Sequence, residues 1–196
     1  PSLKASTPLE EWSEAARKTV QAGWQALKFT PFAFPGRGEL TRTIPWSEIR
    51  RGLDRVAAVR EAVGEDVDLY LELAGKFDVP TAIRIGRAVE KYRIGFIEEP
   101  IPPENVQAMR EVRGKTSIPV AAGERLYGRG GFRPFLEAGA LDILQPDAMR
   151  TGGLLETKLI AAMAEAYYVP SPPTTPAAPW EPSPPCTPAW RCRTSK

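Results

Sequence analysis

The chain has 196 residues, of which 42% are hydrophobic and 26% are charged, and its formal net charge is +2. It contains no apolar run near the ~20 residues that a membrane helix needs, so we expect a soluble globular protein with a sizeable core. The excess charge lies in residues 171–196, and the neutral remainder gives no electrostatic support for a nucleic-acid partner. Cys186 and Cys192 lie in the same segment. A cysteine-free body is compatible with a reducing compartment, so the cytoplasm is the default location.

Short apolar runs alternate with longer amphipathic stretches between residues 10 and 170, as in repeated β-α units with parallel strands. In chain order we predict helix 9–22, strand 25–29, helix 46–63, strand 67–72, helix 79–92, strand 95–98, helix 103–113, strand 118–122, helix 130–138, strand 141–145 and helix 153–167, with a further strand beginning at Tyr168. This order predicts an α/β fold, either a parallel barrel or a doubly wound open sheet. The doubly wound sheet is the less favoured reading, because Lys28-Phe-Thr-Pro follows the first strand where a Gly-rich phosphate loop is expected.

Polar residues stand at the C-terminal ends of successive predicted strands. They are Lys28, Glu72, Glu98, Glu124 and Asp147, and the last four are 26, 26 and 23 residues apart, about one β-α unit each. In a parallel barrel all strand C-termini open onto one face, where active sites are built. Three glutamates gathered there would repel one another unless a cation neutralised them, and their hard oxygen ligands suit Mg²⁺. The alternative is that each glutamate caps the following helix or pairs with an arginine such as Arg125.

Three strings resemble motifs of the enolase superfamily. They are Phe96-Ile-Glu-Glu-Pro100, Ala122-Gly-Glu-Arg125 and Gln145-Pro-Asp-Ala-Met-Arg-Thr-Gly-Gly153. The group they resemble most is that of mandelate racemase and muconate lactonizing enzyme, particularly its acid-sugar dehydratases of the galactonate and mannonate type. The resemblance implies an incomplete TIM-type (β/α) barrel, roughly strands two to six plus the start of strand seven. It also implies that Glu72, Glu98 and Glu124 bind Mg²⁺ and that Asp147 corresponds to the aspartate that orients a catalytic histidine.

The reaction implied by the resemblance is the dehydration of a small-molecule sugar acid. Removal of the α-proton gives an enediolate whose charge the metal offsets, and the β-hydroxyl then departs as water, which leaves a 2-keto-3-deoxy acid. The family is often homo-oligomeric. A racemase, epimerase or cycloisomerase of the same superfamily is the enzymatic alternative. A non-catalytic pseudoenzyme fragment that retains only metal binding is an alternative of another class.

Several positions depart from the family pattern. Lys28-Phe-Thr30 keeps only the first lysine of the Lys-x-Lys found in racemase-like members, which weakens a two-base racemization mechanism. Lys28 is then a base, a cation that binds the substrate carboxylate, or an exposed strand-end residue. Ala74 stands where galactonate-type dehydratases have the histidine that protonates the leaving hydroxyl. Arg150 either contacts the substrate or lies on the surface at the start of the next helix.

The composition changes at Ser171, since residues 171–196 hold eight of the 21 prolines and the chain has no histidine. Family members continue here with Pro-His-Asn-Pro. A shifted reading frame joins the codons of Pro173 and Thr174 into a His codon, and those of Thr174 and Thr175 into an Asn codon. We therefore expect two segments, a partial barrel catalytic domain at 1–170 and a Pro-rich tail at 171–196 that is an out-of-frame translation. The alternative is a genuine Pro-rich tail.

The first residue is Pro1, and no signal-peptide pattern precedes the first predicted helix, so we also expect a truncated chain. Members of the family normally have an N-terminal capping domain and a first barrel strand, and we expect both to be absent from this sequence. An unclosed barrel leaves apolar edges, so we expect an unstable or inactive product.

Overall fold

The computed structural model describes residues 3, 7–33 and 42–172, in which helices and strands alternate. In chain order the elements are α1 (Leu9–Gln21), β1 (Ala26–Phe29), α2 (Trp46–Val63), β2 (Asp68–Glu72), α3 (Val79–Val89), a 3₁₀ turn (Glu90–Tyr92), β3 (Ile94–Glu98), α4 (Val106–Arg113), β4 (Val120–Ala122), α5 (Gly128–Ala138), β5 (Ile143–Leu144), α6 (Ala148–Thr151) and α7 (Leu154–Glu165). None of these helices combines the length and apolar character needed to cross a membrane.

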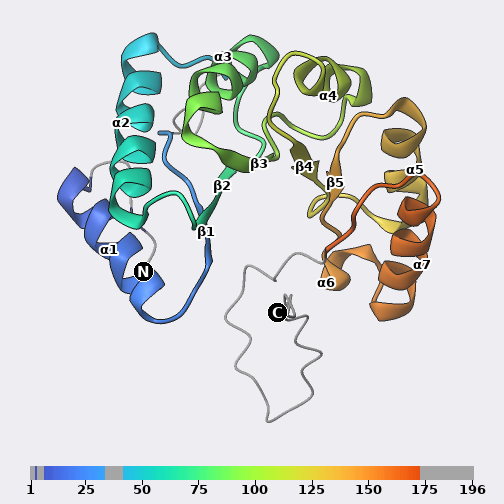
Figure 1. Ribbon diagram of the computed structural model, residues 1–196. Helices are drawn as coiled ribbons and strands as arrows, with labels where there is room; N and C mark the ends of the chain where they lie inside the picture. Colours follow the sequence, from blue (N-terminus) through green and yellow to red (C-terminus); the bar gives the residue numbers. More distant parts are fainter. Residues whose placement is uncertain (1–2, 4–6, 34–41, 173–196) are drawn as a thin grey trace.

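The five strands form one parallel sheet in the order β1-β2-β3-β4-β5. Each strand pairs with its predecessor in the chain, whereas a doubly wound sheet reverses its order at a switch point. Figure 1 shows the sheet curving, with α2, α3, α4 and α5 in an arc on its outer side. Within the described residues the curve does not close. The prediction of an incomplete (β/α) barrel is therefore confirmed, and the doubly wound alternative is wrong.

The alternation of side chains along the strands decides which residues face the inside of the curve. In β2, Leu69 and Leu71 are fully buried in the core shared with α1, α2 and α3. Tyr70 points the other way and stacks on Phe96 of β3, with 4.3 Å between the ring centroids. Because successive strand side chains alternate, Glu72 shares the inner face with Tyr70. The sequence periodicity that buries the leucines thus also turns the strand-end glutamate inward.

The segment after α7 differs from the prediction that a strand begins at Tyr168. Tyr168 has φ +56° and is almost fully exposed. The Val169 N–H donates to the Ala164 carbonyl at 3.1 Å, so α7 ends in a Schellman-type turn that needs a left-handed residue. After this turn the chain forms a backbone hydrogen bond with β5 at Pro170, whose carbonyl accepts the Leu144 N–H at 2.9 Å.

Asp78 caps α3 and leads to a stability prediction. Its carboxylate accepts the Thr81 N–H at 2.8 Å and a short hydrogen bond from the Thr43 hydroxyl. Burial acts to raise the pKa of Asp78, but these hydrogen bonds outweigh it and hold that pKa below its ordinary value. A lowered folded-state pKa stabilises the fold above the ordinary carboxyl pKa of about 3.9, and this contribution is lost as the pH falls through the folded-state value.

We expect Asp78→Ala to lower the free energy of unfolding by about 1 kcal/mol at neutral pH, and by less in acid. Urea unfolding at neutral pH and below the pKa of an ordinary carboxyl measures this difference. Asn105→Ala is the matched control, because Asn105 caps α4 through an uncharged side chain that accepts the Ala108 N–H at 3.0 Å. The control should show the same loss at both pH values. An Asp78→Ala loss that is equally independent of pH would contradict the prediction.

Candidate functional site

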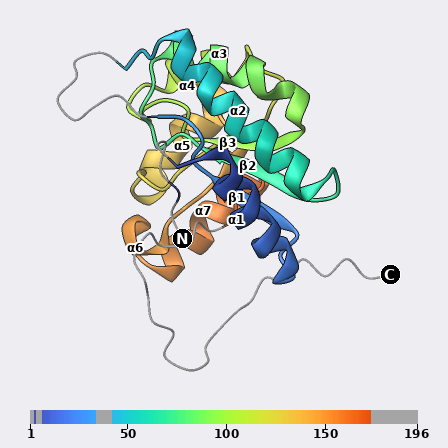
Figure 2. The same cartoon turned by 90° about the vertical axis from the view of Figure 1, so that its left-hand side faces the viewer.

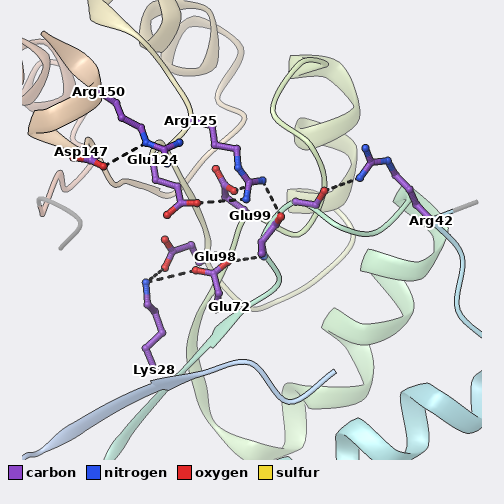
Figure 3. A network of polar contacts seen from close by, with 11 residues as sticks. Lys28, Arg42, Glu72, Glu98, Glu99, Glu124, Arg125, Asp147 and Arg150 are labelled. Atoms are coloured by element: carbon purple, nitrogen blue, oxygen red, sulfur yellow. Dashed lines mark hydrogen bonds and ion pairs between the residues drawn. The ribbon is translucent and has the colours of Figure 1, made fainter. Parts of the chain in front are cut away.

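Charged side chains from four strands gather at the C-terminal edge of the sheet (Figure 3). Lys28 lies on β1, Glu72 and Glu98 end the paired strands β2 and β3, and Glu124 follows β4. Lys28 Nζ is 3.6 Å from Glu72 Oε2 and donates a short hydrogen bond to Glu98 Oε2. Glu124 lies close enough for its charge to act on both Lys28 and Glu72. The structure thus brings the three predicted glutamates to one region around Lys28.

The cluster holds more carboxyl groups than the single ammonium of Lys28 can pair with. The Glu98 side chain is fully buried, and its Oε1 has no hydrogen-bond partner within the described residues. Burial raises the pKa of Glu72 to about 8, and repulsion by Glu98 adds to this while Lys28 opposes it. Burial acts to lower the pKa of Lys28, but the hydrogen bond to Glu98 and the surrounding carboxylates raise it overall. Such a site favours the arrival of a further cation.

The chemical type of these side chains suits a divalent cation, because Mg²⁺ prefers carboxylate oxygens as ligands. Glu98 Oε1 is such an oxygen, and it has no hydrogen-bond partner among the described residues. In the part of the chain that the structure describes, however, no three acidic, histidine or cysteine side chains are grouped so as to hold one ion as they stand. The Lys28 ammonium lies against two of the carboxylates instead. A metal ion would compete with this ammonium for the same oxygens.

Pairing with Arg125 involves chiefly Glu99, the second glutamate of the Glu-Glu pair. Arg125 Nη1 is 2.7 Å from Glu99 Oε2, whereas its Nη2 is 3.5 Å from Glu124 Oε1. Burial raises the pKa of Glu99 to about 7, although Arg125 opposes the rise. Glu99 belongs to the string Phe96-Ile-Glu-Glu-Pro100, but no role was predicted for it. A signal was present, because consecutive glutamates at a strand end point in different directions and need different partners.

Asp147 and Arg150 lie beside this cluster, at the beginning of α6 (Figure 3). The Asp147 carboxylate caps α6 by accepting the Met149 N–H at 2.8 Å, and Arg150 Nε lies 3.6 Å from Asp147 Oδ2. The positive charge of Arg150 also reaches Glu99. The catalytic role of Asp147 and the substrate-binding role of Arg150 stay predictions.

Comparison with known proteins gives a consistent family assignment. A family model described as enolase C-terminal domain-like matches residues 11–182. D-gluconate dehydratase of Thermoproteus tenax is 40% identical over 158 residues, which cover 81% of this chain and 31% of that protein. D-galactonate dehydratase of Ralstonia nicotianae is 39% identical over 165 residues, which cover 84% of this chain and 42% of that protein.

Solved structures of similar proteins share the fold. A member of the enolase superfamily from Salmonella Typhimurium has a TM-score of 0.82 and 39% identity, covering 88% of this chain and 45% of its own. A mandelate racemase/muconate lactonizing enzyme-like protein from Rubrobacter xylanophilus has a TM-score of 0.82 and 37% identity, covering 91% and 49%. The chain therefore spans between about a third and a half of the length of these similar proteins.

Proposed function

The chain belongs to the enolase C-terminal domain-like family, and from this premise we propose that its site serves the Mg²⁺-dependent dehydration of sugar acids. The observation that carries the proposal is the cluster of Glu72, Glu98 and Glu124 around Lys28, in which Glu98 Oε1 is buried and has no partner among the described residues. The substrate class is supported by the names of the similar proteins, which are dehydratases of D-gluconate and D-galactonate.

Each residue of the site has a role in this proposal. Glu72, Glu98 and Glu124 would hold the metal. When bound, Mg²⁺ supplies positive charge that binds the substrate carboxylate and offsets the negative charge that develops as the α-proton leaves. Lys28 lies among the same carboxylates, which raise its pKa and favour its ammonium form, so it can bind the substrate carboxylate. To accept the α-proton as a base it would first have to lose its own proton. The guanidinium of Arg150, which is 45% exposed, can bind the substrate at the rim of the site.

Loss of the β-hydroxyl as water would leave an enol, and transfer of a proton to C3 as the enol hydroxyl loses its own would give the 2-keto-3-deoxy acid. In the galactonate-type pattern a histidine donates a proton to the departing β-hydroxyl, but the corresponding position is Ala74. The role implied for Asp147, orienting a histidine, likewise has no partner in a chain without histidine. These two observations favour a second candidate, a non-catalytic protein that retains only metal binding. The absence of a second lysine after Lys28 disfavours a two-base racemase.

An assay of the chain with a panel of aldonic acids, with and without Mg²⁺, tests the proposal. Mg²⁺-dependent formation of a 2-keto-3-deoxy acid supports dehydration. Inversion at the α-carbon without loss of water supports racemization or epimerization. Metal binding without turnover of any acid in the panel supports the non-catalytic reading, and the absence of both binding and turnover contradicts all three.

We expect Mg²⁺ to stabilise the folded chain, because the metal would bind the assembled carboxylates and not the unfolded chain. At 100 times its dissociation constant, Mg²⁺ should raise the free energy of unfolding by about 2.7 kcal/mol. Urea unfolding with MgCl₂, compared with NaCl at equal ionic strength, measures the effect and removes the contribution of general screening. Equal stabilisation by both salts would show that the carboxylates do not bind the metal specifically.

The division into a partial barrel at 1–170 and an out-of-frame tail at 171–196 is also a proposal. It is supported by the shifted reading of the codons for Pro173 and Thr174. Residues 173–196 lie outside the described part of the chain. The family match extends to residue 182, so a boundary at Pro170 is not visible in that comparison. The DNA sequence tests the proposal, because codons incompatible with the His-Asn-Pro reading would contradict it.

A further inference from the structure

The chain turns sharply directly after Glu72, where Ala74 has φ +52° and Gly75 has φ +62°. The Ala74 N–H donates to Glu72 Oε1 at 2.5 Å, and the Gly75 N–H donates to the Glu99 carbonyl at 2.8 Å. The turn therefore connects the carboxylate at the end of β2 to the backbone that follows β3. Its shape decides where the Glu72 carboxylate lies.

Arg125 contacts both this turn and Glu99, with which it forms an ion pair (Figure 3). Its Nη1 donates to the Ala74 carbonyl at 2.8 Å and lies 2.7 Å from Glu99 Oε2. A Cβ atom on Gly75 would lie 2.3 Å from the same Nη1, so a larger residue at this position would have to displace the guanidinium. Arg42 donates to the Gly75 carbonyl at 2.9 Å. The guanidinium of Arg125 thus lies against the turn and is held there by Glu99.

The contact between Glu99 and Arg125 offsets the unfavourable burial of the Glu99 carboxylate. The Glu99 side chain is fully buried, and neither of its carboxylate oxygens has a hydrogen-bond partner among the described residues. Its backbone also has φ +42°, a left-handed conformation that residues other than glycine rarely adopt. Conformations of this kind persist where the surroundings enforce them, and they cluster at functional sites. Here the ion pair with Arg125 compensates the buried carboxylate directly, and the positive charge of Arg150 adds to it.

We infer that Glu99 and Arg125 are a positioning pair, which fixes the turn at Ala74 and Gly75 and so aims the Glu72 carboxylate at the metal site. The inference rests on the proposed function, because the metal ligands are what the pair positions. Neither residue needs to touch the metal or the substrate. Residues that orient metal ligands in this way typically contribute a factor of 10 to 100 in metal affinity.

Charge alone makes a different prediction from positioning, which allows a sharp test. Glu99→Gln removes a negative charge near the site, so both explanations expect weaker binding of a cation. Arg125→Gln removes a positive charge. If the pair acted only through its charge, this variant should bind the cation more tightly, whereas a positioning role predicts weaker cation binding. Arg133→Gln is the matched control, because Arg133 is an exposed arginine of α5 that pairs with Glu137 away from the cluster.

The experiment measures two properties of the whole chain and its variants. The first is the affinity for Mn²⁺, followed by the electron paramagnetic resonance signal of the free ion. Positioning predicts binding about 10- to 100-fold weaker in both Glu99→Gln and Arg125→Gln, with no change in the control. The second is the hydrogen exchange of the Ala74 and Gly75 amides, measured by NMR relative to amides of α2. It should be about two- to tenfold faster in both variants, the expected consequence of losing a hydrogen bond.

Weaker Mn²⁺ binding in both variants, together with faster exchange at the turn, supports the inference. Tighter binding in Arg125→Gln overturns it, as does unchanged exchange at Ala74 and Gly75. If the parent chain takes up no Mn²⁺, the proposed function fails, and the exchange rates alone decide whether the pair fixes the turn.

Discussion

Glu98→Gln is expected to weaken the binding of Mn²⁺ or Mg²⁺ by more than about 100-fold, because it removes a proposed metal ligand. Loss of a residue that only orients a ligand already costs a factor of about 10 to 100 in metal affinity. Glu98 is fully buried, hydrogen bonds to Lys28 through one oxygen and has its other oxygen without a partner among the described residues. Glutamine keeps the shape of the side chain but lacks the negative charge and one acceptor oxygen. Calorimetric titration with Mn²⁺, followed by competition with Mg²⁺, measures the loss.

Glu137→Gln is the matched control for this variant, because Glu137 is an exposed glutamate of α5 that pairs with Arg133. It should bind the metal as the parent chain does. Circular dichroism would establish that both variants are folded. An affinity of folded Glu98→Gln within about threefold of the parent value would remove Glu98 from the metal site, since a ligand should contribute far more than this.

Gly123→Ala is expected to lower the free energy of unfolding by about 3 kcal/mol, because overpacking and backbone strain each cost about 1 to 3 kcal/mol. Gly123 lies between β4 and Glu124 and has φ +149°. A Cβ atom at this position would lie 2.8 to 2.9 Å from backbone atoms of Gln145, which cannot rotate away as a side chain would. Urea unfolding measures the loss, and Mn²⁺ titration of the folded fraction shows whether Glu124 is displaced as well.

Gly130→Ala is the appropriate comparison, since Gly130 lies exposed in α5 and a Cβ atom there would meet nothing within 4 Å. Alanine is favoured over glycine inside a helix by about 0.5 to 1 kcal/mol, so this variant should be slightly more stable than the parent. Equal stability of the two variants would contradict the close approach of β4 and β5 at Gly123.

The helices and the inward direction of the strand-end residues could be predicted because they depend on local periodicity. The amphipathic pattern of residues 46–63 coincides with α2. The repeated spacing of Glu72, Glu98 and Glu124 indicated that they lie at the ends of consecutive parallel strands, as the structure shows for β2 and β3 and, two residues beyond the strand, for β4. Helix α6 was not predicted, because four residues are too few to show a helical period.

The partners of the site residues could not be predicted, because they depend on contacts between distant parts of the chain. Lys28 was predicted at the edge of the sheet, but its contact with Glu98 joins residues 70 positions apart. The ion pair of Glu99 with Arg125 depends on a positive φ at Glu99 and on the room that Gly75 leaves for the guanidinium. Neither feature produces a periodic signal. The alternative prediction paired an arginine with one or more of the three proposed ligands. In the structure Arg125 lies closest to Glu99, the residue that follows Glu98.

The ammonium of Lys28 beside Glu72 and Glu98 has a consequence for the order of events during maturation of the protein. Some small metal-binding domains stay unfolded until their ion arrives, because nothing else holds their ligands together. Here a side chain of the protein itself bridges two of the acidic groups beforehand. If the proposed metal site is correct, the polypeptide can therefore fold first and bind the ion afterwards, with the ion replacing the Lys28 ammonium beside Glu72 and Glu98.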